Sequence, residues 1–134
     1  MIKLLDVGGE GRFGQAVNLN IRSVKTLGPN KGAPIPSYLR GRADEIPLPD
    51  ATVRVLVMER TPLSRASVIE LRRVVIPGGF IILRHHASII NPHRVAGEIF
   101  GEPIATTLTK IGSQTVFQSV YRVRKANADR KSNQ

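Results

Sequence analysis

The stretch Leu4-Leu-Asp-Val-Gly-Gly-Glu-Gly-Arg12 points to the fold class. Residues 2–7 are largely apolar, and this pattern predicts a buried strand that ends at Gly8. Glycines directly after a strand let the backbone turn tightly and approach a ligand closely. A tight turn that binds nothing accounts for the same glycines, so ligand contact at Gly8, Gly9 and Gly11 is one of two interpretations.

Strands and helices alternate along the rest of the chain. Apolar or alternating runs predict further strands at residues 16–21, 52–58, 80–83, 104–111 and 115–124. Apolar periodicity predicts helices at 64–75 and 92–100. Residues 28–37, rich in Gly and Pro, are expected to form a loop.

The predicted helix over 64–75 carries the clearest boundary signals. Ser64 can cap its N-terminus, and Pro77-Gly78-Gly79 is expected to stop it before the next strand begins. Its apolar face is expected to consist of Ala66, Ile69, Leu71 and Val74.

This order of elements predicts an α/β protein. Short βαβ units wind right-handedly and give a parallel sheet. The last two strands, joined by Gly112-Ser113-Gln114, predict an antiparallel hairpin at one end of that sheet. Ligands of such sheets bind in the crevice outside the carboxyl ends of the strands.

Length and composition limit the domain count and the class of protein. The 134 residues predict one domain over 1–124, followed by a basic flexible tail over 125–134. The chain has no Cys, which excludes disulfides, thiolate metal sites and a Cys nucleophile. It has no apolar run long enough to cross a membrane and no signal-peptide pattern, so we expect a cytoplasmic protein without a membrane partner.

The charge is strongly positive. Twenty Lys and Arg residues face ten Asp and Glu, and fourteen of the twenty are Arg, which matches phosphate geometry with two donors. This balance favours a nucleic-acid partner, although a soluble basic surface or an acidic protein partner accounts for it as well. Aromatic residues are few, which favours folded or duplex RNA over stacked single strands. The candidate nucleic-acid-binding residues are Arg60, Arg72, Arg73, Arg122, Arg124 and Lys125.

Three motifs, in order along the chain, resemble those of the class I S-adenosylmethionine-dependent methyltransferases. The best match is Gly41-Arg-Ala-Asp-Glu-Ile-Pro-Leu-Pro-Asp50, which precedes a Val-rich strand. The second is Glu70-Leu-Arg-Arg-Val-Val-Ile-Pro-Gly-Gly79, and the third is the stretch from Leu4 to Arg12 quoted above. The resemblance spans residues 2–124 and implies a Rossmann-like sheet, mostly parallel, that ends in an antiparallel hairpin and has a reduced N-terminal half.

The resemblance also implies S-adenosylmethionine as cofactor. The residues that match the family's cofactor site are Asp6, Gly8, Gly9, Gly11, Asn20 and Asp44. Asp44 falls where the family's carboxylate meets the adenine amino group, although it could instead cap a short helix over 45–48. Asp6 could accept from a cofactor amine or simply anchor the loop.

The chain departs from the family at several of these positions. Only residues 12–15 separate the glycine loop from the next strand, where the family has a helix. Glu10 and Arg12 stand where the family has glycines, although a register from Gly9 through Gly11 to Gly14 keeps three of them. The family's acidic residue for the ribose hydroxyls is replaced by Asn18 or Asn20.

The ends of the fourth and fifth family strands would hold the acceptor. Glu59 could orient or deprotonate it, and Arg60 could hold a phosphate, although a surface ion pair accounts for both. His85 and His86 are candidate general bases, and adjacent residues of a strand point to opposite faces, so at most one of them faces the crevice. The histidines have no carboxylate at metal-ligand spacing, so we expect no metal.

Together these features predict methyl transfer from S-adenosylmethionine to a nucleic acid (RNA) or a small acceptor. A non-catalytic module of the same fold that binds RNA or a protein partner remains an alternative. So does a small toxin-like effector that acts on RNA or a nucleotide. A protein partner or a second copy of the chain could complete the shortened site.

Overall fold

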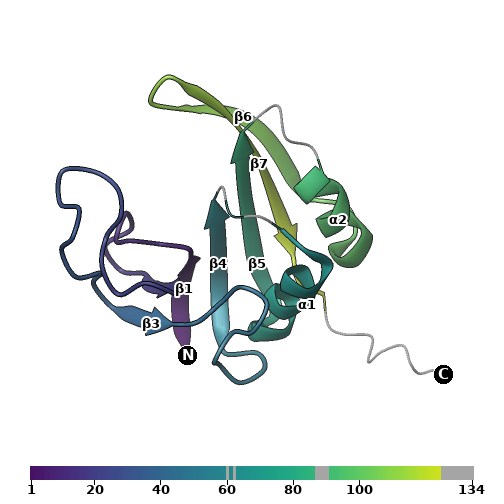
Figure 1. Ribbon diagram of the computed structural model, residues 1–134. Coiled ribbons are helices and arrows are strands. Elements are labelled where there is room, and N and C mark those ends of the chain that lie inside the picture. The colour runs from purple at the N-terminus through teal and green to yellow at the C-terminus, as the bar shows by residue number, and fades with distance from the viewer. Residues whose placement is uncertain (60, 62, 87–90, 125–134) are drawn as a thin grey trace.

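The computed structural model describes residues 1–59, 61, 63–86 and 91–124, and its strands form one sheet (Figure 1). The elements follow one another along the chain as β1 (Ile2–Val7), β2 (Val17–Asn20), β3 (Tyr38–Arg40), β4 (Val53–Glu59), α1 (Arg65–Val74), β5 (Val75–His86), α2 (Asn91–Phe100), β6 (Ala105–Ile111) and β7 (Gln114–Arg122). The expected tail over 125–134 lies outside the described residues.

The sheet has the strand order β3-β2-β1-β4-β5-β7-β6. Strands β3 to β5 pair in parallel, whereas β7 is antiparallel to both β5 and β6. The Rossmann-like methyltransferase sheet that the sequence predicts is therefore confirmed, including its antiparallel hairpin. All residues between β1 and β4 are described, and loops take the place of helices there.

The structure differs from the local predictions at β5 and at β3. β5 begins at Val75, directly after the helix, so Pro77-Gly78-Gly79 lies inside a strand and does not separate the two elements. The chain bulges there, because Val53 pairs with Val75 but Val55 already pairs with Phe80. β3, which is only three residues long, was not predicted.

The predicted apolar face of α1 is correct at Leu71 and Val74 and wrong at its other two positions. Ser67, Val68, Leu71 and Val74 are buried, whereas Ala66 and Ile69 are exposed. Ser64 caps the helix as expected, and its side chain accepts a hydrogen bond from the backbone N–H of Ser67. Because this cap fixes where the first turn begins, it also fixes which residues of the helix face the sheet.

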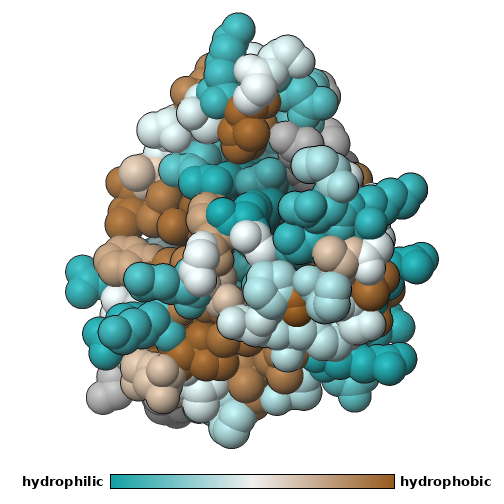
Figure 2. Space-filling view, turned by 90° about the vertical axis from the view of Figure 1, so that its left-hand side faces the viewer, coloured by the Kyte–Doolittle hydropathy of each residue, from teal (hydrophilic) through white to brown (hydrophobic). Residues whose placement is uncertain are grey.

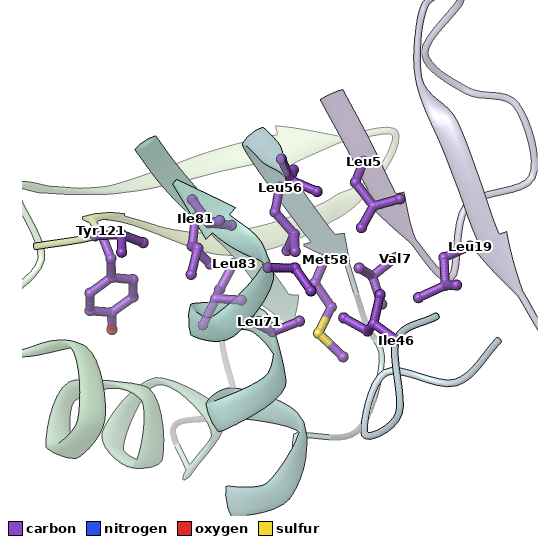
Figure 3. Packing of buried hydrophobic residues seen from close by; sticks show 14 of the residues in the cluster. Leu5, Val7, Leu19, Ile46, Leu56, Met58, Leu71, Ile81, Leu83 and Tyr121 are labelled. Atoms are coloured by element: carbon purple, nitrogen blue, oxygen red, sulfur yellow. The ribbon is translucent and has the colours of Figure 1, made fainter. Parts of the chain in front are cut away.

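Both helices lie on the same side of the sheet (Figure 1). Leu71 and Val74 of α1 belong to one apolar cluster with Leu5, Leu56 and Ile81, which lie side by side on the sheet (Figure 3). All five side chains are completely buried. We call this side of the sheet the helix face.

The opposite side of the sheet, which we call the open face, has no helix over it among the described residues. Its apolar side chains include Leu4, Val55, Phe80, Ile82 and Val120, which are partly exposed, whereas Val57, which pairs with Ile82, is buried. Figure 2 shows the molecule from the left-hand side of Figure 1, where β1, β3 and the loops between them lie, with patches of apolar side chains between polar ones. No helix among the described residues is long and apolar enough to cross a membrane.

Candidate functional site

A cleft lies where the order of the strands reverses. The chain runs outward from β1 to β2 and β3 and then returns to β4 on the other side of β1, so the loops after β1 and β4 diverge. The cleft has a volume of about 510 Å³, which is within the range of small-molecule sites. It is lined by Val7, Gly8, Asn20, Ile21, Gly41, Arg42, Ala43, Asp44, Thr61, Ser64 and Ser67.

Of the glycines that follow β1, Gly8 is the one that lines the cleft. Its φ is +80°, and a Cβ there would lie 2.8 Å from Oγ1 of Thr61, so both the backbone conformation and the space require glycine. Gly9 and Gly11 instead pack against the protein. A Cβ on Gly9 would overlap the side chains of Asp6 and Asn18, and one on Gly11 would press on Pro36.

Asn20 and Asp44 reach the cleft from two different loops. The Asn20 amide donates to the carbonyl oxygen of Gly9 at 3.1 Å, which fixes its side chain beside the glycine loop. Asp44 lies in a turn and caps no helix, so the alternative interpretation, a short helix over 45–48, is wrong. Its carboxylate accepts two hydrogen bonds from Arg42, at 3.0 and 3.1 Å, and this pairing lowers the pKa of Asp44.

Asp6 and Glu59 lie outside the cleft lining and are bridged by an arginine. The guanidinium of Arg12 donates from Nε to Oδ2 of Asp6 at 2.9 Å, and its Nη1 lies 3.2 Å from Oε2 of Glu59. Asp6 is fully buried, and burial raises its pKa although Arg12 opposes the shift. Glu59 also lies 3.6 Å from Nη1 of Arg84, so two guanidiniums face two carboxylates.

Phe13 completes this charged group, because its ring lies close to both arginines. The Cζ atoms of Arg12 and Arg84 lie 5.3 and 5.8 Å from the centre of the ring, within the range of cation–π attraction. Residues 12 and 13 stand where the methyltransferases have a helix. The guanidinium of Arg12 and the ring of Phe13 link side chains at the ends of β1, β4 and β5. The sequence marked Arg12 only as a departure from the glycine pattern.

The two histidines at the end of β5 point to opposite faces of the sheet. His85 is buried, and its Nε2 lies 3.2 Å from the carbonyl oxygen of Thr61, a cleft residue. Burial lowers the pKa of His85, so the neutral imidazole is favoured. His86 is exposed. His85 is thus next to the wall of the cleft, whereas His86 is on the open face.

The remaining site residue candidates are spread over the surface. Arg73 is held by Glu70, by Asp50 and by backbone carbonyls, and Arg72 donates to the carbonyl of Ile99 at 3.2 Å. Arg122 and Arg124 are exposed at the end of β7 and just after it. Arg60 and Lys125 lie outside the described residues. Among those that are described, no three His, Asp or Glu residues form a group that could hold a metal ion.

Eight of the eleven cleft residues were not predicted as site residues, and three of these eight carry hydroxyls. Thr61 follows β4, and Ser64 and Ser67 lie at the N-terminus of α1, where the hydroxyls cap the helix. Ser64 was recognised as a cap but not as part of a site. The link between the two roles comes from the fold, because a helix that follows a central strand begins at the carboxyl edge of the sheet.

The comparisons with known proteins give the class of fold. No family model and no curated protein sequence matches the chain. Solved structures do match over nearly its whole length, and they include S-adenosylmethionine-dependent methyltransferases. The chain therefore has the fold of the class I S-adenosylmethionine-dependent methyltransferases.

Three of these structures show how far the likeness extends. A methyltransferase from Methanosarcina mazei has a TM-score of 0.70 at 11% identity, with 93% of each chain covered. The N-methyltransferase NodS from Bradyrhizobium japonicum has a TM-score of 0.67 at 8% identity, with 92% of this chain and 87% of that one covered. The 16S rRNA (adenine(1408)-N(1))-methyltransferase from Catenulisporales acidiphilia has a TM-score of 0.63 at 15% identity, with 92% and 86% covered.

Proposed function

We propose that the cleft binds the nucleoside part of S-adenosylmethionine and that the protein transfers the methyl group to an acceptor, with RNA as the favoured acceptor class. The observation that carries this proposal is the position of the cleft. It lies at the reversal of the strand order and brings Gly8, Asn20 and Asp44 into one cavity. The methyltransferase fold of the solved structures supports the same reading.

The residues of the cleft suit a nucleoside. The ionised Asp44 can accept a hydrogen bond from the exocyclic amine of adenine, and the Asn20 amide can pair with ribose hydroxyls. Gly8, which has no side chain, leaves room for the ligand beside the backbone. S-adenosylmethionine supplies a methyl group on a sulfonium sulfur, and the task of the protein is to align the acceptor with that methyl carbon.

RNA is favoured as acceptor because the surroundings of the cleft are basic. Arg42 lines the cleft itself, and Arg22, Lys31 and Arg40 are exposed on the neighbouring β2–β3 side. These cations add to a net charge of +10, which attracts phosphates over long range. The solved 16S rRNA methyltransferase shows that this fold can serve an RNA acceptor.

Calorimetric titration with S-adenosylmethionine and S-adenosylhomocysteine tests the cofactor site. We expect binding, and we expect Asp44→Ala to weaken it about tenfold or more, since hydrogen bonds to charged groups contribute roughly 1.5–3 kcal/mol. Glu45→Ala is the matched control, because it removes the neighbouring carboxylate, which lies outside the cleft lining. If neither S-adenosylmethionine nor S-adenosylhomocysteine binds, the proposal is overturned.

A second candidate function is nucleoside binding without methyl transfer. The observation that favours it is the bridge from Arg12 to Asp6 and Glu59, which engages the two carboxylates at the ends of β1 and β4. A cofactor that carries an ammonium group would have to compete with this guanidinium. Adenosine, which has no such group, would not.

The two candidates differ in the ligand that they prefer. Nucleoside binding alone predicts that adenosine binds as tightly as S-adenosylmethionine, whereas a working cofactor site predicts that the cofactor binds more tightly. Transfer of a labelled methyl group from S-adenosylmethionine to total RNA then tests the acceptor class. Label in RNA supports the first candidate, and tight adenosine binding without transfer supports the second.

A further inference from the structure

A band of apolar side chains crosses the open face from β1 to β7. Leu4, Val55 and Phe80 are neighbours in one row of the sheet, and Ile82 and Val120 are neighbours in the next. These five side chains are partly exposed, whereas Val57, which precedes Ile82 in the second row, is buried. We call this set the open band.

The same strands bury the apolar side chains next to the open band on their other side. Leu5, Leu56 and Ile81 each lie one residue along from a member of the open band and have 0% exposure. Parallel sheets are found almost only with both faces covered, and their strands are therefore apolar on both sides. The sequence of β1, β4 and β5 matches that pattern, but the described chain supplies helices for one face only.

The surroundings of the open band are basic. Arg122 lies in the same row as Phe80, with its guanidinium carbon 5.9 Å from the centre of the Phe80 ring. Arg124 is exposed two residues further on, and no ion pair joins either arginine to another described residue. At the other end of the band, Arg12 and Arg84 balance the carboxylates of Asp6 and Glu59. The open face therefore has an excess of positive charge.

These features exclude most occupants of the open band. A second copy of the chain would bring Arg122 and Arg124 against the same basic surface, in a protein of net charge +10. Residues 125–134 of the chain itself are polar and carry three cations against one anion. RNA bases stack on aromatic side chains, and the open band has one aromatic among four aliphatics.

We propose that the open face binds an acidic amphipathic helix of a partner protein. The apolar side of such a helix covers the open band, and its carboxylates meet Arg122 and Arg124. Neighbouring strands lie about 4.8 Å apart, so four strands from β1 to β7 span roughly 15 Å, which is the length of a helix of about ten residues. This inference does not depend on what the cleft binds.

Two designed peptides test the proposal. Each is about 18 residues long, which is enough to form a helix, with Leu along one side; the other side carries Glu in one peptide and Lys in the second. Fluorescence anisotropy with the labelled peptides measures binding to the whole chain. We expect the Glu peptide to bind at least tenfold more tightly than the Lys peptide, and added salt to reduce the difference.

Variants locate the binding surface. Ile82→Glu places a carboxylate in the middle of the open band and should abolish binding of the Glu peptide. Arg122→Glu, at the surface, should weaken it at least fivefold without altering the apolar band. Leu108→Glu is the matched control, because Leu108 is 66% exposed on the hairpin, outside the open band, and its replacement should leave binding unchanged. The urea midpoint of each variant shows whether it is folded.

Several results would overturn the proposal. Equal binding of both peptides would remove the role of charge, and absence of binding would remove the site. If the Glu peptide binds Ile82→Glu and Arg122→Glu as tightly as wild type, the binding site lies outside the open face. Sedimentation shows whether the chain dimerises, and a dimer that Ile82→Glu dissociates would make a second copy the occupant. Competition by RNA for the Glu peptide, lost in Arg122→Glu, would make nucleic acid the occupant.

Discussion

The two faces of the sheet are built from the same strands but are held together in different ways. On the helix face, α1 and α2 bury Leu5, Leu56 and Ile81 completely. On the open face, the guanidinium of Arg12 and the ring of Phe13 cover the carboxyl ends of the strands, and the open band stays partly exposed. The comparison shows that in a shortened N-terminal half, where a helix is missing, a guanidinium can cover the carboxyl ends of the strands. It does not cover the open band.

The largest expected difference between the faces lies in their apolar side chains. Ile81→Ala should lower the free energy of unfolding by about 3–4 kcal/mol, because it leaves a cavity in the buried cluster. Ile82→Ala, one residue along on the open face, should cost about 1 kcal/mol, since solvent fills the space. Urea unfolding measures both values. Equal losses would mean that the open face is covered as well as the helix face.

Removal of the guanidinium at the end of the open face should have the next largest effect. Arg12→Met leaves the buried Asp6 without its partner and should cost about 2–3 kcal/mol, less than the 3–5 kcal/mol of a fully buried pair because Arg12 is one-third exposed. The double variant Asp6→Asn with Arg12→Met should recover part of the loss. If Arg12→Met has the same urea midpoint as wild type, the pairing of Arg12 with Asp6 does not stabilise this end of the sheet.

The contributions of Asp6, on the open face, and of Glu70, on α1, to stability should depend on pH with opposite signs. The pKa of Asp6 is raised by burial, so its contribution to stability is present below its ordinary value of 3.8 and is lost as pH rises through the folded pKa. The pKa of Glu70 on α1 is lowered, chiefly by its hydrogen bond from Arg73. Its contribution is present above its ordinary value of 4.5 and is lost as pH falls through the folded pKa.

Unfolding at a series of pH values checks these signs. The stability difference between wild type and Asp6→Asn should shrink as pH rises from about 3, whereas that between wild type and Glu70→Gln should grow. Parallel curves for the two variants would contradict the assignment of the shifts to burial and to Arg73.

The smallest expected effect concerns the helix that covers the helix face. Ser64→Ala removes the side chain that accepts from the N–H of Ser67 and should cost about 1 kcal/mol. Ser64→Asp should retain most of the stability, because a carboxylate can accept the same hydrogen bond. Thermal unfolding followed by circular dichroism measures both. A loss above the cost of Ile81→Ala would show that the cap matters more than the apolar packing.

Most of the fold could be predicted because its signals are local. Alternation and apolar runs give β1, β4 and the hairpin, and Ser64 gives the start of α1. β5 was shortened in the prediction because Pro77 and two glycines are typical of a turn, whereas here they form a bulge inside the strand. β3 has three residues and owes its existence to pairing with β2, which no local pattern reports.

The candidate site was only partly predictable from the sequence. Gly8 and Asp44 belong to the motifs, Asn20 was predicted from its place at the end of a strand, and all three line the cleft. Asp6 belongs to a motif and Glu59 was predicted from its place at the end of a strand, but the structure places both with Arg12, outside the cleft lining. That pairing depends on the path of the loop after Gly11, which turns the arginine back over the ends of the strands, and a single sequence does not contain that information.

The place of β1 in the middle of the sheet has a kinetic consequence. β1 is the first strand of the chain, yet it pairs with β4 only across the whole segment 8–52, which contributes just two short strands in between. The unit β4–α1–β5 is local, and folding rates fall as the separation of contacting residues grows. The chain should therefore assemble its second half first and insert β1 late. A β1 strand that waits unpaired, apolar on both sides, is the segment that a chaperone would have to shield during synthesis.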